Sequence, residues 1–342
     1  MQARAFITGV SGPELSAAER EFIRSERPWG FILFKRNVET PQQVGLLVAE
    51  MRKVAGSLDA PVLIDQEGGR VQRLGPPYWP VYPPGALFGA LYDVDRKLGL
   101  SAARLSARLI AADLEALGIN VDCLPLADVP VPGADTVIGD RAYGTNPEKV
   151  AAIARAVTEG LKDGGILPVL KHIPGHGRAT ADSHFRLPEV KTSQNELERT
   201  DFAAFQPLAD LPMAMTAHVV FSALDPVHPA TTSATIVERV IRGVIGFQGL
   251  LMSDDVSMNA LSGSIAERTE AIFSAGCDMV LHCNGKLEEM REVAAETPEL
   301  SGKALERARR ALASRRAPKP FDRVAGRAEL DAIMSGAGTT GA

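Results

Sequence analysis

Ionisable side chains stand near the ends of four short apolar runs of the sequence. Asp65 follows PVLI, Lys171 and His172 follow ILPVL, His218 lies in MAMTAHVVF, and Asp254 follows GLLMS. Buried charges are costly unless they are paired, so packing alone does not account for four such positions. If the runs are parallel strands, their carboxyl ends lie at one edge and these groups form a polar cluster there. A strand-end aspartate can equally cap a helix, so each residue taken singly remains ambiguous.

A second concentration of reactive groups lies in LKHIPGHGRATADSHF, residues 170–185. It contains three of the six histidines, His172, His176 and His184, together with Asp182. These groups could bind a metal ion, carry out acid–base chemistry in which Asp182 orients or charges His184, or form a structural loop. The histidines lie on a loop rich in glycine and proline rather than on the helix typical of zinc motifs, which disfavours a metal. His176 stands between two glycines, where bracing the loop is the simplest interpretation.

The elements that must position these groups follow an alternating pattern. Apolar, β-branched runs are typical of strands, and the longer stretches between them have helical periodicity. The expected strands are 5–10, 30–34, 61–66, 119–127, 166–172, 213–221, 249–255 and 279–283. The expected helices are 16–25, 41–55, 97–118, 148–164, 233–246 and 264–276. Such strands pair in parallel through right-handed crossovers, so eight units predict a single (β/α)8, TIM-like barrel of the α/β class.

The main alternative fold is a doubly wound open sheet. That fold favours a G-x-G-x-x-G turn after the first strand, where this chain has GVSGPELS. We therefore expect one catalytic barrel domain over residues 1–330, followed by a disordered tail at 331–342. The segment 67–96 is rich in glycine, proline and aromatic residues, which predicts a long loop over the active-site face. A basic, solvated outer helix ended by prolines is expected at 302–321.

The bulk composition argues against several classes of protein. The chain has 342 residues and a formal net charge of −5, with lysine and arginine scattered along it, so no surface for nucleic acid or anionic lipid is expected. The N-terminal MQARAFITGVSG does not have the pattern of a signal peptide, and no apolar run reaches the roughly 18 residues of a membrane span. Three cysteines, an odd and sparse set, favour free thiols over disulfides. These features predict a cytoplasmic protein.

Several motifs connect the two groups of reactive residues. KHIPGHG with the following DSH, IDQEGGRVQRL (64–74) and SDD (253–255) occur together with GDRAYGTNP (139–147) and AGCDMVLHC (275–283). Over residues 5–285 the chain resembles the bacterial β-N-acetylglucosaminidases of glycoside hydrolase family 3, in their short, single-domain Gram-negative type. The resemblance implies hydrolysis of terminal β-linked N-acetylglucosamine, with no metal and no cofactor. The implied partner is a small-molecule substrate, the N-acetylglucosaminyl-1,6-anhydro-N-acetylmuramyl (peptide) fragment of peptidoglycan recycling.

The resemblance also implies a role for each motif residue. Asp254 takes the position of the nucleophile, His184 that of the proton donor and acceptor, and Asp182 that of its dyad partner. The residues at the sugar-binding positions are Asp65, Arg73, Arg141, Lys171 and His172. A histidine titrates near neutrality, so it could give and take back a proton in place of the usual carboxylic acid. We expect the loop to close before His184 reaches Asp254, and the protein to be a monomer or a weak homodimer.

Three other functions fit parts of the pattern. A phosphorylase of the same family would use phosphate in place of water, and a histidine acid would not repel phosphate. A metal-dependent barrel hydrolase would use the histidine-rich loop for ligands, whereas a non-catalytic sugar-binding barrel would not need Asp254 and the Asp182–His184 pair together. Two neighbours are expected to be structural: Asp255, on the opposite side of its strand from Asp254, and His218, behind the site.

Overall fold

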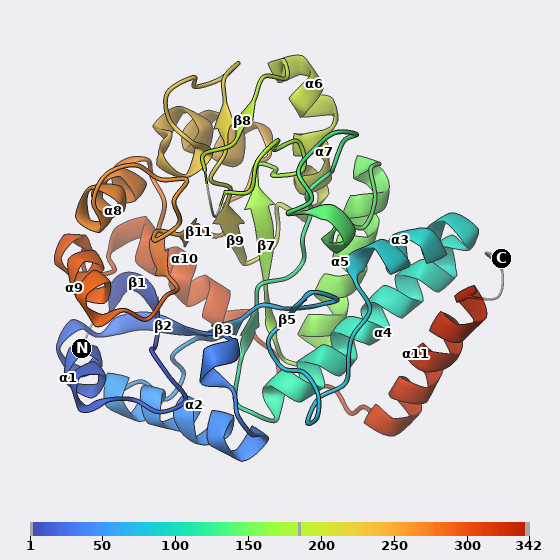
Figure 1. Ribbon diagram of the computed structural model, residues 1–342, viewed down its shortest axis with the longest axis horizontal. Helices are drawn as coiled ribbons and strands as arrows, with labels where there is room; N and C mark the ends of the chain where they lie inside the picture. Colours follow the sequence, from blue (N-terminus) through green and yellow to red (C-terminus); the bar gives the residue numbers. More distant parts are fainter. Residues whose placement is uncertain (1–2, 184–185, 339–342) are drawn as a thin grey trace.

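Eight parallel strands form a closed barrel in the computed structural model, which describes residues 3–183 and 186–338 (Figure 1). Each strand pairs with the next along the chain, and the last closes on the first. The predicted (β/α)8 barrel is therefore confirmed, although the fourth strand is short, and its segment pairs with the next strand again through an isolated bridge between Leu126 and Lys171. The barrel strands are β1 (Arg4–Gly9), β2 (Pro28–Leu33), β3 (Val62–Ile64), β6 (Val121–Asp122), β7 (Leu167–Ile173), β9 (Met213–Thr216), β11 (Leu250–Asp255) and β12 (Met279–His282).

Side chains from every strand fill the barrel interior. The opposite faces of the strands pack against the helices, as Phe6, Phe31 and Ile64 do. Because both faces of each strand are buried, the strands appear in the sequence as continuous apolar runs rather than as polar alternation. The interior cluster includes Ile7, Ile32, Leu63, Val121, Val169, Met215, Met252 and Leu281.

Helices surround the barrel and cover its outer face (Figure 1). Hydroxyl, carboxylate or amide side chains accept hydrogen bonds at the start of several of them, as at Ser16, Thr40 and Asn146. The helix predicted at 302–321 ends at Ala313. Within the described residues, none of the helices has the length and apolarity needed to cross a bilayer. The surrounding helices are α1 (Ala17–Glu26), α2 (Pro41–Ala55), α4 (Arg96–Glu115), α5 (Pro147–Asp163), α6 (Gln194–Arg199), α7 (Asp201–Phe205), the π-helix η5 (Ile236–Val244), α8 (Ile265–Ser274), α9 (Leu287–Glu296) and α10 (Gly302–Ala313).

The segment predicted as one long loop, 67–96, contains regular structure. Gln66–Gly68 (β4) and Val71–Gln72 (β5) form an antiparallel hairpin, and Gly85–Val94 form helix α3. Helix α3 packs on α4 and buries an apolar face there. The loop prediction failed for this part because tertiary burial of an apolar helix face outweighs a high local content of glycine and proline.

The C-terminal segment is helical where disorder was predicted. Helix α11 spans Arg323–Gly338 and lies against α4 (Figure 1). Leu330 is buried in this contact, and Arg323 forms an ion pair with α4. The prediction of a disordered tail at 331–342 is therefore wrong up to residue 338, because the apolar residues of α11 find a partner surface that lies far away in the sequence. Residues 339–342 lie outside the described part of the chain.

Candidate active site

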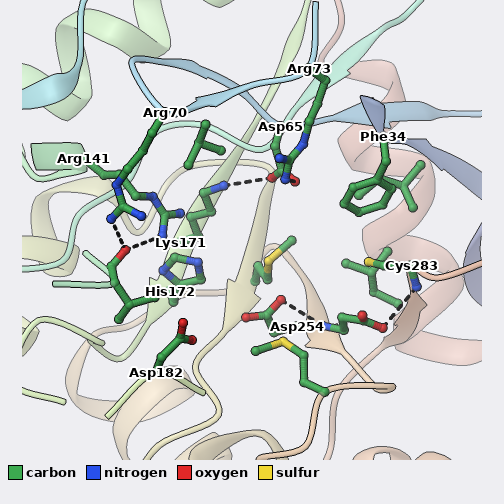
Figure 2. A pocket seen from close by; sticks show the side chains of 17 residues that line it. Phe34, Asp65, Arg70, Arg73, Arg141, Lys171, His172, Asp182, Asp254 and Cys283 are labelled. Atoms are coloured by element: carbon green, nitrogen blue, oxygen red, sulfur yellow. Dashed lines mark hydrogen bonds and ion pairs between the residues drawn. The ribbon is translucent and has the colours of Figure 1, made fainter. Parts of the chain in front are cut away.

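A pocket opens at the carboxyl ends of the barrel strands, where the sequence placed the reactive groups (Figure 2). Apolar side chains such as Ile32, Phe34, Met215 and Met258 complete its walls. Of the predicted site residues, only His184 lies outside the described part of the chain. The other seven all line the pocket, and they are Asp65, Arg73, Arg141, Lys171, His172, Asp182 and Asp254.

Five charged side chains of alternating sign form a chain of ion pairs along one wall. Arg73 Nη2 lies 2.9 Å from Asp65 Oδ2, and Asp65 Oδ1 lies 3.0 Å from Lys171 Nζ. Lys171 Nζ lies 2.5 Å from Glu67 Oε1. Arg141 binds the Glu67 carboxylate through two nitrogens, each at 2.8 Å. Bidentate and charge-assisted contacts of this kind have restricted geometry, so the wall presents ordered donors and acceptors to a polar ligand.

The neighbours of these groups determine their charges. Burial alone would raise the pKa of Asp65, but Lys171 and Arg73 outweigh it and hold that pKa well below its ordinary value. Burial likewise opposes ionisation of Glu67, but Arg141 and Lys171 lower the pKa of Glu67 to about 2. Burial lowers the pKa of Lys171, whereas Asp65 and Glu67 raise it above the ordinary lysine range. At neutral pH the two carboxylates are therefore ionised and Lys171 is protonated.

Two buried carboxylates of this region were not identified from the sequence. Glu67 lies behind the pocket wall, next to Lys171 and Arg141. Asp128 Oδ2 lies 2.7 Å from His172 Nδ1, which orients the imidazole toward the pocket. A signal was available for both, because Glu67 is two residues beyond Asp65 and Asp128 directly follows the predicted strand 119–127.

The histidine-rich loop is held by hydrogen bonds on both sides of His176. The His176 backbone N–H donates to Asp128 Oδ1 at 2.6 Å, and its Nε2 lies 3.0 Å from Ser183 Oγ. The backbone N–H of Ala260 donates to the Ser183 carbonyl oxygen at 3.2 Å. These contacts anchor the residue next to Asp182, whose side chain lines the pocket. His176 thus braces the loop, in agreement with the sequence-based interpretation.

Asp254 and Asp255 both end β11 but have different surroundings. Asp254 lines the pocket, and its Oδ1 accepts a hydrogen bond from the Asp255 backbone N–H at 2.8 Å. Asp255 accepts hydrogen bonds from the Cys283 backbone N–H at 3.1 Å and from the Ser257 hydroxyl at 2.7 Å. Burial lowers the pKa of His218, whose neutral ring can donate from Nε2 to the Asp255 carbonyl oxygen at 3.0 Å. Asp255 therefore has the contacts of a structural acid, although it also contributes to the pocket lining.

The arrangement suits nucleophilic substitution accompanied by proton transfer. The Asp254 carboxylate, at the end of β11, shares a pocket with Asp182 of the histidine-rich loop. Both lie beside the wall of ion-paired charges. Within residues 3–183 and 186–338, no group of three histidine, cysteine, aspartate or glutamate side chains could hold a metal ion. The cysteines Cys123, Cys277 and Cys283 are buried free thiols.

Buried His176 should make the stability of the protein depend on pH. Burial lowers the pKa of His176 to about 4, below the value of about 6.5 for an unfolded histidine. Between these values the unfolded chain binds more protons, so the contribution is present above pH ~6.5 and is lost as the pH falls toward ~4. Replacing His176 by glutamine should remove up to about 3 kcal/mol of this pH dependence in the free energy of unfolding, measured by denaturant titration from pH 7 to pH 4.

The exposed His228 supplies the control for this measurement, because replacing it removes a histidine that is not buried. Because the His228 side chain is 57% exposed, His228→Gln should change the slope of unfolding free energy against pH much less than His176→Gln does. A His176→Gln slope equal to that of the wild type would contradict the assignment of His176 as a neutral brace.

Known proteins resemble this chain in sequence and in structure. Residues 5–314 match the family described as Glycosyl hydrolase family 3 N terminal domain. The chain is 39% identical over 282 residues to the β-hexosaminidase of Alkalilimnicola ehrlichii, covering 81% of this chain and 79% of that protein. It is 37% identical over 324 residues to the β-hexosaminidase of Methylococcus capsulatus, covering 94% of this chain and 91% of that protein. The crystal structure of NagZ from Neisseria gonorrhoeae in complex with N-trifluoroacetyl-D-glucosamine matches with a TM-score of 0.84 at 30% identity, over 98% of each chain.

Proposed function

The chain belongs to glycosyl hydrolase family 3 and is a glycosidase, a β-N-acetylhexosaminidase, and we propose that it acts on fragments of peptidoglycan. The proposed reaction removes terminal β-linked N-acetylglucosamine from N-acetylglucosaminyl-1,6-anhydro-N-acetylmuramyl (peptide) fragments, with retention of configuration. One observation carries the mechanism: Asp254, at the end of a barrel strand, shares its pocket with Asp182 of the DSH loop. A cytoplasmic location, where the buried thiols stay reduced, is part of the proposal.

The charged wall would bind the non-reducing sugar. Hydroxyl groups both donate and accept hydrogen bonds, and the wall supplies both kinds of partner. Asp65 would accept from sugar hydroxyls, while Arg73 and Lys171 would donate to them. Arg141 would donate to the remaining polar groups of the ring, including the acetamido oxygen. His172, whose Nδ1 donates to Asp128, would accept from a sugar hydroxyl through Nε2. Charge-assisted hydrogen bonds are stronger than neutral ones, so this wall would orient the ring above Asp254.

In the first proposed step, the Asp254 carboxylate attacks the anomeric carbon and the glycosidic bond breaks. The departing oxygen takes a proton from His184, and Asp182 stabilises the imidazolium before that transfer. The product of this step is a glycosyl ester on Asp254, together with the released muramyl part of the substrate. This use of an Asp–His pair replaces the second carboxylic acid of most retaining glycosidases.

In the second proposed step, water attacks the anomeric carbon of the ester. Neutral His184 accepts a proton from that water, the ester bond breaks, and Asp254 returns as a carboxylate. Two inversions at one carbon leave the released N-acetylglucosamine in the β configuration. A histidine suits both steps because the same imidazole is first an acid and then a base near neutral pH.

The proposal predicts hydrolysis rather than phosphorolysis. Purified protein should release N-acetylglucosamine from a chromogenic β-N-acetylglucosaminide and from the disaccharide fragment, with the β anomer first in a proton NMR time course. Added phosphate should leave the product unchanged, because water completes the reaction. Release of N-acetylglucosamine 1-phosphate would instead identify a phosphorylase, and first appearance of the α anomer would exclude the double displacement.

A further inference from the structure

Glu67 is the member of the charged wall that is buried away from the pocket, yet it joins two residues that line the pocket. Its carboxylate contacts Lys171 Nζ at 2.5 Å and two nitrogens of Arg141 at 2.8 Å. We infer that Glu67 is a positioning residue: it holds Lys171 and Arg141 where they contact the sugar. This inference rests on the proposed function, because it assigns to both cations a contact with bound substrate.

The local backbone leaves Glu67 little freedom. It is the central residue of β4, and two glycines follow it at positive φ, 94° for Gly68 and 56° for Gly69. A Cβ atom on Gly68 would lie 2.3 Å from the Pro83 carbonyl oxygen, so this turn requires glycine. Gln66 accepts hydrogen bonds from the backbone N–H groups of Arg73 and Leu74 and thereby closes the hairpin. The hairpin therefore presents the Glu67 carboxylate at a defined point behind the pocket.

The charge of Glu67 matters because the cations it contacts are close to each other. Both Lys171 and Arg141 approach the same oxygen, Oε1, and Lys171 is only 2% exposed. Lys171 and Arg141 are close together and largely shielded from solvent, so they would repel each other if no anion lay between them. A neutral amide at this position could accept a hydrogen bond from one of them but would not offset that repulsion.

Glu67 also affects what Asp65 can do. Among the described residues, Asp65 and Glu67 are the carboxylates that pair with Lys171, and Asp65 also pairs with Arg73. Asp65 lines the pocket, so it must keep lone pairs for a ligand, whereas Glu67 is screened from the pocket. Neutralising Glu67 would leave Asp65 as the one carboxylate paired with Lys171, while Asp65 still pairs with Arg73. Asp65 would then be a weaker hydrogen-bond acceptor for the substrate.

The test is a kinetic comparison of Glu67→Gln with the wild type on a chromogenic β-N-acetylglucosaminide. Loss of the group that supports a metal ligand typically costs roughly 10- to 100-fold in metal affinity or activity, and we take the same range for the group that supports these sugar-binding cations. We expect KM to rise by roughly this factor and kcat to change much less, because Lys171 and Arg141 bind the ground state as well as the transition state. Glu67→Asp, which keeps the charge but is one methylene shorter, should have an intermediate KM.

Asp278 supplies the matched control. It is also a buried carboxylate that joins two cations, with Arg242 and Arg307 each at 2.8 Å, but it precedes β12 at the opposite end of the barrel from the pocket. Asp278→Asn should lower the thermal midpoint and leave KM at the wild-type value. If Asp278→Asn raises KM as much as Glu67→Gln does, the effect is general destabilisation and the inference is wrong.

A pH profile provides a readout that a purely structural role would not change. The charged and titratable groups facing Lys171 are Asp65, Glu67, Arg141, Asp122, Cys123 and Tyr143. In Glu67→Gln, burial and Arg141 still lower the pKa of Lys171, while one of the two paired carboxylates that raise it, Asp65, remains. Loss of the His184 proton should lower kcat/KM with rising pH in both proteins. The variant should show an additional fall at more alkaline pH, which the wild type lacks, as Lys171 loses its proton.

The outcomes separate this inference from the proposed function. If the wild type does not hydrolyse the substrate, the proposed function fails. If the wild type is active and Glu67→Gln keeps both its KM and its alkaline profile, the inference about Glu67 fails while the proposed function stands. Should Glu67→Gln not fold, Glu67→Asp takes its place, and an unchanged KM in that variant overturns the inference.

Discussion

Replacing Asp254 by alanine is expected to lower kcat for a β-N-acetylglucosaminide by roughly 10⁴- to 10⁶-fold, the range seen when single members of a serine protease's catalytic triad are removed. Asp254 ends β11 and lines the pocket, and the contacts of its neighbour Asp255 are with backbone and Ser257. Among the other described carboxylates of the pocket, Asp65 is paired with Arg73 and Lys171, and Asp255 accepts from Ser257 and Cys283, so we expect neither to replace Asp254. Asp254→Asn should be nearly as inactive, because an amide keeps the shape but has no charge for the attack.

Small anions give this prediction a sharper form. The space left in Asp254→Ala should admit azide, which can attack the anomeric carbon in place of the missing carboxylate. The expected product is the α-glycosyl azide, because one inversion replaces two. Formation of that product from a substrate with a good leaving group would identify Asp254 as the nucleophile. Asp278→Asn, treated identically, should keep its activity and form no azide adduct, whereas wild-type activity in Asp254→Ala would overturn the mechanism.

Replacing His184 by alanine is expected to cost roughly 10²- to 10⁴-fold in kcat/KM on the disaccharide fragment, the usual range for a general acid–base. An alkoxide is a poor leaving group, so its departure depends on protonation. The dinitrophenolate of a dinitrophenyl glycoside can leave without a proton. The rate of the first step with that substrate should therefore fall much less in His184→Ala. His184 lies outside the described residues, and Asp182 is the member of the proposed dyad whose place in the pocket is described.

If Asp182 and His184 act as a dyad, the effects of replacing each of them on the rate should not be additive. If Asp182 acts only through His184, then the double variant lacking both should be no slower than His184→Ala alone. His176→Ala provides the matched control on the same loop, since it removes a histidine that braces the backbone and does not line the pocket. Any fall in kcat/KM in His176→Ala should be similar for substrates with good and with poor leaving groups. Equal losses for both substrates in His184→Ala would contradict the role of general acid.

Much of the fold could be predicted from local sequence, because strand and helix periodicity are properties of neighbouring residues. Each of the eight apolar runs overlaps one of the eight barrel strands, although the runs 119–127 and 213–221 extend well beyond theirs, and the barrel brings the carboxyl ends together. Asp65, Lys171 and Asp254 were therefore identifiable as one cluster before any contact was known. The exceptions are helix α3 and helix α11, whose apolar faces pack on α4. Their stability depends on a surface that is distant in the sequence.

The site divides in the same way. The sequence by itself predicted which residues could react, because residue type and motif pointed to Asp254, Asp182 and the proposed sugar-binding residues. It also singled out His176 as a brace from its glycine neighbours alone. Only the tertiary structure decided which charges neutralise each other. Glu67 joins Lys171 to Arg141 across 104 and 74 positions of the chain, and Asp128 orients His172 across 44. Ion pairs act over a few ångströms in space and leave no periodic trace in the sequence, so the partners of a reactive group emerge only when the barrel closes.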